Sequence, residues 1–145
     1  MTGVPEVLLC DTSYLGWSRR VHAEPGRLAQ WPADVLERIV HARLAITPMT
    51  IAAERYGWLV ARWGAERVAR SQRLLRSLLL IPLDLSVVER YAHLRSQCRS
   101  LGLDFGYHDL WIAATAIDRR VTLVSCDSRQ CSIPGLSALS LPPPV

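Results

Sequence analysis

The sequence predicts an α/β sandwich with a mostly parallel central sheet of four to five strands, formed by a single domain over residues 1–145. Short apolar segments alternate with longer segments whose apolar residues recur at helical spacing, which is typical of parallel sheets covered by helices. In addition, two of the apolar segments, "LLCD" and "LVSCD", run directly into an aspartate. Parallel sheets carry their sites at the carboxyl ends of strands, so these aspartates are candidate site residues.

The composition supports one domain with a sizeable core. The chain has 145 residues, of which 50% are hydrophobic, and it contains no uninterrupted apolar run long enough to span a membrane. The N-terminus lacks a basic region followed by a long apolar stretch, so we expect no secretory signal and a cytoplasmic location. The four cysteines form no CxxC pair, which favours reduced core thiols over zinc ligands.

The charge balance makes an anionic partner plausible. The net charge is +4, and all 17 basic residues are arginines. Codon bias in a GC-rich genome explains the absence of lysine most simply. Phosphate recognition is a compatible reason, because a guanidinium grips phosphate through two parallel hydrogen bonds.

The strands and helices are predicted from the spacing of apolar residues and from residues that are typical of helix and strand ends. The strands span residues 6–10, 44–47, 78–84, 121–126 and, as a short fifth, 136–141. The helices span residues 12–22, 34–43, 47–58, 65–79 and 86–102, and a further helix with Asp109 in its first turn runs to Ile117.

End signals define three of these boundaries. Thr47 and Pro48 occupy the N-cap and first helical positions, and a capping box of Ser86 and Glu89 opens the helix that closes on Gly102. Residues 22–33 are turn-rich and predict a loop.

Four acids are expected to converge at one edge of the sheet. Asp11 and Asp127 follow predicted strands directly, and Asp109 lies in the first turn of a helix. Glu54 lies about two turns into the helix that follows the second strand. If the connections are right-handed crossovers, these positions come close together in space.

Each acid also has a purely structural explanation. Asp11 and Asp109 are placed where helix caps occur, and Asp127 is placed where a turn occurs. Glu54 could simply be solvated and paired with a nearby arginine. Four acids near one edge are nevertheless harder to explain separately than together.

The other polar candidates are weaker. Asp118 is interpreted as a solvated helix end, and Asp104 remains a candidate that the spacing does not exclude. His108 precedes Asp109 and could contact a substrate, although a helix-entry role explains it as well.

A carboxylate cluster of this kind is suited to a hard divalent cation. Carboxylates a few ångströms apart repel one another, and Mg²⁺ reverses that repulsion because it prefers oxygen ligands. A bound ion polarises a phosphoryl group and lowers the pKa of a water, which together hydrolyse a phosphodiester. The sequence contains no GxSxG, Walker or GxGxxG motif that would indicate another chemistry.

The chain resembles the PIN-domain family, and within it the VapC-like toxins of toxin–antitoxin pairs. The resemblance rests on "LLCDTS", "TPMTIAAERYG", "GYHDLWIAATAI" and "VTLVSCDSRQCSIPGL" and covers nearly the full length. The third motif is the most specific, because an aspartate leads directly into "LWIAATA".

The resemblance implies a three-layer α/β/α fold and a ribonuclease that depends on Mg²⁺ or Mn²⁺. Its implied partners are an RNA substrate, a small antitoxin protein and a second copy of the chain in a homodimer. Carried over by position, its catalytic and metal-binding acids fall on Asp11, Glu54, Asp109 and Asp127, with Ser13 and Ser125 as polar supports.

Two alternative functions remain open. One is a non-catalytic PIN-like module that binds RNA or protein, although such a module has no reason to keep all four acids. The other is a phosphohydrolase of the aspartyl-phosphate type, which usually carries a second acid where this chain has Ser13.

Overall fold

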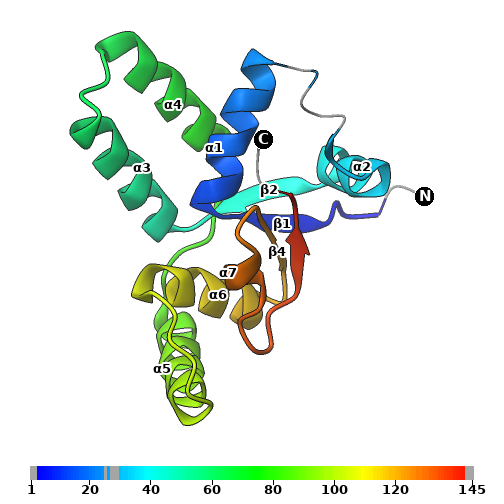
Figure 1. The fold of residues 1–145 in the computed structure, drawn as a ribbon, viewed down its shortest axis with the longest axis vertical. Coiled ribbons are helices and arrows are strands. Elements are labelled where there is room, and N and C mark those ends of the chain that lie inside the picture. Colours follow the sequence, from blue (N-terminus) through cyan, green and yellow to red (C-terminus); the bar gives the residue numbers. More distant parts are fainter. Residues whose placement is uncertain (1–2, 25, 27–29, 143–145) are drawn as a thin grey trace.

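The computed structural model describes residues 3–24, 26 and 30–142, in which helices alternate with short strands (Figure 1). The strands are β1 (Val7–Cys10), β2 (Arg43–Ile46), β3 (Leu79–Leu80), β4 (Thr122–Ser125) and β5 (Ala138–Ser140). The helices are α1 (Thr12–Ala23), α2 (Ala33–His41), α3 (Pro48–Val60), α4 (Ala65–Ser77), α5 (Leu85–Ser100), α6 (Tyr107–Arg119) and α7 (Ser128–Cys131).

The strands of the described residues form one sheet in the order β3-β2-β1-β4-β5. Every neighbouring pair is parallel, so the predicted fold class is confirmed. In the centre of the sheet, Leu9 of β1 is paired with Ala45 of β2 and with Leu123 of β4. The strands are short, and three of the four residues of each central strand, β1 and β4, are buried, as expected for a parallel sheet that is covered on both faces.

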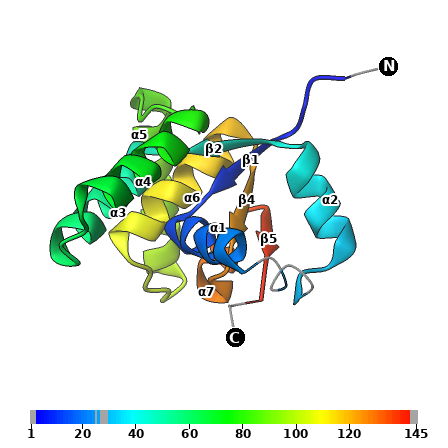
Figure 2. The same ribbon diagram turned by 90° about the horizontal axis from the view of Figure 1, so that it is seen from above.

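Helices cover both faces of this sheet and give the three layers. Leu8 and Val124 point into one apolar cluster with residues of α1, α2, α3 and α4. Leu9 and Leu123, one residue away in each strand, pack on the opposite face against Ile112 of α6. Figure 1 shows α5 beyond α6 on that side, and Figure 2 shows α3 and α4 side by side at one end of the molecule.

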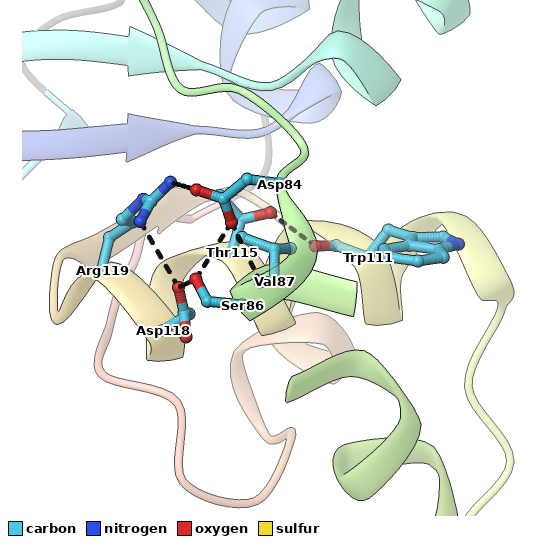
Figure 3. A network of polar contacts seen from close by, with 7 residues as sticks. All are labelled: Asp84, Ser86, Val87, Trp111, Thr115, Asp118 and Arg119. Atoms are coloured by element: carbon cyan, nitrogen blue, oxygen red, sulfur yellow. Dashed lines mark hydrogen bonds and ion pairs between the residues drawn. The ribbon is translucent and has the colours of Figure 1, made fainter. Parts of the chain in front are cut away.

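A polar network joins the start of α5 to the end of α6 (Figure 3). The Asp84 carboxylate accepts a hydrogen bond from the Val87 amide at 3.2 Å and forms an ion pair with Arg119. The Ser86 hydroxyl donates to Asp84 at 3.0 Å and to Asp118 at 2.6 Å.

This network contradicts two predictions from the sequence. The capping box was wrong, because Asp84 and not Ser86 is the N-cap of α5. The interpretation of Asp118 as a solvated end was also wrong, because its side chain is 13% exposed and lies 3.6 Å from the Arg119 guanidinium. The Ser86 hydroxyl that donates to Asp118 lies on the other helix, so a local pattern did not reveal that contact.

Other element boundaries moved by a few residues. The predicted third strand shrinks to Leu79–Leu80, because Pro82 has no amide proton for a sheet ladder. The predicted loop over 22–33 is shorter, since α1 continues to Ala23 and α2 begins at Ala33. Residues 25 and 27–29 of that loop lie outside the described residues.

Two predictions of absence can be compared with the structure. Among the described residues, no helix is both long and apolar enough to cross a membrane. The four cysteines are free thiols; Cys10 and Cys98 are buried, and the other two are half-buried.

Candidate active site

The candidate site lies where β1 and β4 end side by side in the middle of the sheet. From β1 the chain continues to β2 and β3 on one side, and it later returns to β4 and β5 on the other. Such a reversal of strand order leaves a crevice beyond the carboxyl ends of the two central strands. Asp11 follows β1 directly, and Asp127 lies two residues after β4.

Three of the four predicted acids meet at this crevice. Asp11, Asp109 and Asp127 line one hollow of about 190 Å³, which we call the acid hollow. Asp109 reaches it from the first turn of α6. The complete lining is Asp11, Thr12, Ser13, His108, Asp109, Ile112, Asp127 and Gln130.

Asp11 is the most constrained of these acids. It is 2% exposed, and as the N-cap of α1 it accepts a hydrogen bond from the Tyr14 amide at 2.8 Å. The Ser13 hydroxyl donates to both carboxylate oxygens, at 2.8 and 2.9 Å, and the Ser125 hydroxyl donates to Oδ2. The structure therefore places both predicted polar supports directly on Asp11, and these contacts fix the orientation of its carboxylate.

Burial and mutual repulsion raise two carboxyl pKa values in the acid hollow. Burial raises the pKa of Asp11 against the opposing hydrogen bonds of Ser125, Tyr14 and Ser13, and the charge of Asp127 adds to the increase. Burial also raises the pKa of Asp109, again with Asp127 contributing, while His108 and Arg129 oppose it.

The fourth predicted acid, Glu54 of α3, is buried but is not part of the hollow lining. It forms a bidentate ion pair with Arg19 of α1, with Nη1–Oε2 and Nη2–Oε1 distances of 2.6 and 3.1 Å. The Glu54 side chain is 4% exposed, and the Ser71 hydroxyl donates to Oε2 at 3.4 Å. The alternative interpretation from the sequence was a solvated Glu54 paired with an arginine. The arginine pair is present, but the solvent exposure was wrong.

Three further residues of the acid hollow have a buried polar atom without a hydrogen-bond partner. These atoms are Thr12 Oγ1, His108 Nε2 and Gln130 Nε2. An unpaired buried polar group costs about 1–3 kcal/mol, so such groups are rare unless a ligand completes them. The sequence offered His108 as a weak candidate but did not single out Thr12 or Gln130, although both lie next to or near a predicted acid.

The weak candidate Asp104 is not part of this group. It is exposed and lines a different hollow together with residues of α5.

The acid hollow is suited to a divalent cation that keeps some of its waters, and not to one that is enclosed entirely by protein ligands. Among the residues that the structure describes, no three His, Cys, Asp or Glu side chains form a ready set of ligands for one ion. Mg²⁺ does not require such a set, because it is commonly held by one or two carboxylates and keeps several waters. Burial, with a smaller contribution from the charge of Asp127, raises the pKa values of Asp11 and Asp109, and a bound cation would favour their charged forms.

Comparison with known families gives one match over most of the chain. Residues 8–136 match the model of the family described as PIN domain. Ribonuclease VapC5 of Mycobacterium tuberculosis is 28% identical over 146 residues, which cover 97% of this chain and 98% of that protein.

Several solved structures have a similar fold. VapBC-5 of Mycobacterium tuberculosis, from the VapBC family of toxin–antitoxin systems, has a TM-score of 0.64 and 26% identity, with 95% of this chain and 99% of that chain covered. VapBC-1 of nontypeable Haemophilus influenzae has a TM-score of 0.73 and 18% identity, with coverages of 92% and 97%. VapBC2 of Rickettsia felis, bound to a promoter DNA fragment, has a TM-score of 0.71 and 22% identity, with coverages of 92% and 98%.

Proposed function

This chain belongs to the PIN domain family, and on that premise we propose that it is a metal-dependent endoribonuclease that acts as the toxin of a toxin–antitoxin pair. The observation that carries the proposal is the meeting of Asp11, Asp109 and Asp127 in one hollow at the carboxyl edge of the sheet. The similarity to a ribonuclease of the VapC type supports RNA as the substrate class. The acids support the chemistry, because clustered carboxylates hold the cations that assist phosphodiester hydrolysis.

In this proposal the three aspartates hold Mg²⁺ or Mn²⁺, which when bound polarises the phosphoryl group and lowers the pKa of a water. Ser13 and Ser125 keep the Asp11 carboxylate in one orientation through their hydrogen bonds. A fixed carboxylate needs no rearrangement at the moment of reaction, which is the advantage of a preorganised site.

The unpaired atoms of Thr12, His108 and Gln130 supply further hydrogen-bonding groups beside the acids. The hydroxyl and the amide can donate to phosphate oxygens that the carboxylates alone would repel. Glu54 stays in the proposed acid set because of its position in the family motif. It would face a cation only after releasing Arg19, which now neutralises it.

A cleavage assay with matched variants tests the proposal. The wild-type protein is expected to cut single-stranded RNA when Mg²⁺ or Mn²⁺ is present and to stop when the metal is chelated. Asp109→Asn should abolish cleavage while leaving the fold intact, and Asp34→Asn, an exposed acid on α2, should retain it. Full cleavage by Asp109→Asn would reject the assignment, and RNA binding without any cleavage by the wild type would favour the non-catalytic module.

The proposed antitoxin partner is supported by the exposed apolar surface of α3. Tyr56, Leu59 and Val60 are 69%, 77% and 64% exposed, which is unusual for large apolar side chains on one short segment. The similar structures are VapBC toxin–antitoxin systems, which fits a small protein partner here. A homodimer and a cytoplasmic location belong to the same proposal.

Expression in a bacterium without the partner is expected to inhibit growth, and Asp109→Asn should relieve that inhibition. Unimpaired growth with soluble wild-type protein would argue against the toxin role but would leave the nuclease assignment to the cleavage assay.

A further inference from the structure

A second hollow lies at the first turn of α6, and its lining includes the residue that precedes the acid hollow residues of that turn. Tyr107 lines it, whereas the adjacent His108 and Asp109 line the acid hollow. Its volume is about 310 Å³, which is at the lower end of the range for small-ligand sites. We call it the arginine–tyrosine hollow, and its polar and aromatic lining is Arg95, Arg99, Asp104, Phe105 and Tyr107.

The cationic side of this hollow is formed by α5. Arg95 and Arg99 are four residues apart and therefore share one face of that helix, and both are exposed. Within the described part of the chain, neither arginine takes part in an ion pair. Two like charges on one helix face repel each other, so an anion between them would be stabilising.

The aromatic side is formed by Tyr107, which is 62% exposed. The Arg95 guanidinium lies over its ring, 4.4 Å from the centroid, and donates to the Tyr107 hydroxyl at 3.1 Å. These contacts hold the ring in place while much of it stays open to solvent. An exposed and immobilised aromatic ring is a surface on which a nucleobase can stack.

Arg129 of α7 connects the two hollows. Its guanidinium donates to the backbone carbonyl of Asp104 and lies 5.4 Å from the Phe105 ring centroid, both in the lining of the arginine–tyrosine hollow. Arg129 is also the neighbour of Gln130, which lines the acid hollow, so α7 borders both hollows. A nucleic-acid backbone passing from one hollow to the other would meet Arg129 on the way.

We infer that the arginine–tyrosine hollow binds a nucleotide of single-stranded RNA that flanks the bond held at the acid hollow. Arg95 and Arg99 bind its phosphate, and Tyr107 stacks on its base. This inference rests on the proposed ribonuclease function and adds a subsite to it. The Asp104 carboxylate repels phosphate and can accept from a base amino group, so the phosphate lies toward α5 and the base toward residues 101–106.

Single-stranded RNA fits this hollow better than a duplex does. The bases of a duplex are stacked on one another and cannot lie on Tyr107, whereas a single strand can splay a base out. The pairing of an arginine with an aromatic ring is also the combination by which proteins bind single strands without strict sequence preference.

The test measures RNA binding separately from cleavage. Asp109→Asn protein is titrated into a fluorescein-labelled, 12-nucleotide RNA of mixed sequence that has no internal pairing, and anisotropy gives Kd at several salt concentrations. In this background, Tyr107→Leu should weaken binding about tenfold, and Tyr107→Phe should retain it because the ring remains. The double variant Arg95→Met with Arg99→Met should weaken binding and reduce the slope of log K against log salt by about 1.4.

The controls keep the outcomes distinct. Arg90→Met removes an exposed arginine of α5 that does not line the hollow, so it should change Kd and the salt slope less than the double variant does. Circular dichroism and thermal melting establish that each variant is folded. Unchanged RNA affinity for Tyr107→Leu and for the double arginine variant would overturn the subsite. The subsite would also be overturned if these variants bound the antitoxin more weakly but bound RNA as before.

Failure of the subsite is distinguishable from failure of the proposed function. If the wild type cuts RNA and the subsite variants bind like Asp109→Asn alone, only the subsite is rejected. If the wild type neither cuts nor binds RNA, the ribonuclease proposal falls, and the subsite falls with it.

Discussion

The substitution Arg19→Met removes the guanidinium that faces the buried Glu54 carboxylate but keeps an unbranched apolar side chain. The Glu54 side chain is 4% exposed and receives two hydrogen bonds from Arg19, at 2.6 and 3.1 Å. Breaking a buried ion pair by removing one partner costs about 3–5 kcal/mol, because the remaining charge is uncompensated. Arg19 is 32% exposed, so water can relieve part of this penalty, and we expect a loss of about 3 kcal/mol in the free energy of unfolding.

Urea unfolding at pH 7 without added metal measures this loss. With an m-value of about 2 kcal/mol per molar, 3 kcal/mol lowers the urea midpoint by about 1.5 M. The matched control is Arg38→Met, because Arg38 and Glu6 are also 2.6 Å apart but are 42% and 44% exposed. That exposed pair should contribute less than about 1 kcal/mol.

Equal and small effects of Arg19→Met and Arg38→Met would refute the reasoning, because the Glu54 carboxylate would then not be desolvated. Repeating the unfolding with Mg²⁺ separates a structural role of Glu54 from a metal-binding one. If Glu54 binds the ion, Glu54→Gln should lose part of the stabilisation that Mg²⁺ gives to the wild type. If Glu54 only pairs with Arg19, that stabilisation should be unchanged.

Three further predictions concern charge and unpaired polar groups. Because burial raises the pKa values of Asp11 and Asp109, their contribution to stability is complete below the unfolded pKa of about 4 and is lost as pH rises through the folded values. As pH rises above about 4, the free energy of unfolding of the metal-free wild type should therefore fall more than that of Asp109→Asn, as measured by urea unfolding of both proteins at each pH. Identical pH profiles of the two proteins would contradict this prediction. Gln130→Met removes a buried amide whose Nε2 has no partner, at similar side-chain volume, and should raise the free energy of unfolding by about 1 kcal/mol while slowing RNA cleavage. A less stable variant in urea unfolding would show that this nitrogen is satisfied in the wild type. The hydrogen bond from Arg119 lowers the pKa of Asp84 to about 2, so its contribution should vanish as pH falls from about 4 to 2. Melting temperatures of Asp84→Asn should accordingly depend less on pH in that range than those of the wild type.

The features predicted best from sequence were those that a local pattern fully determines. The runs "EVLLC" before Asp11 and "VTLVSC" before Asp127 predicted two central strands with an acid beyond each, because a short, largely apolar run that leads into an aspartate is typical of a buried strand in an α/β chain. The position of Asp109 in the first turn of α6 followed from the abrupt start of an apolar helix.

The features missed were decided by contacts between distant segments. The predicted capping box at Ser86 missed Asp84, which caps α5 by accepting from the Val87 amide and also pairs with Arg119 from the end of α6. The partner of Glu54 likewise lies 35 residues away on α1. Gln130 was not predicted as a site residue, and only its burial against the acid hollow distinguishes it.

Asp11 is at once the residue on which α1 begins and a wall of the acid hollow. Asparagine caps a helix as well as aspartate does, whereas alanine forfeits about 1 kcal/mol. Alanine scanning would therefore confuse a weakened fold with lost chemistry at this position, although not at Asp109, because α6 starts on Gly106 without a side-chain cap. If position 11 is used to make an inactive protein for co-purification with RNA or with an antitoxin, Asp11→Asn is therefore preferable to Asp11→Ala, because asparagine keeps the first turn of α1 capped.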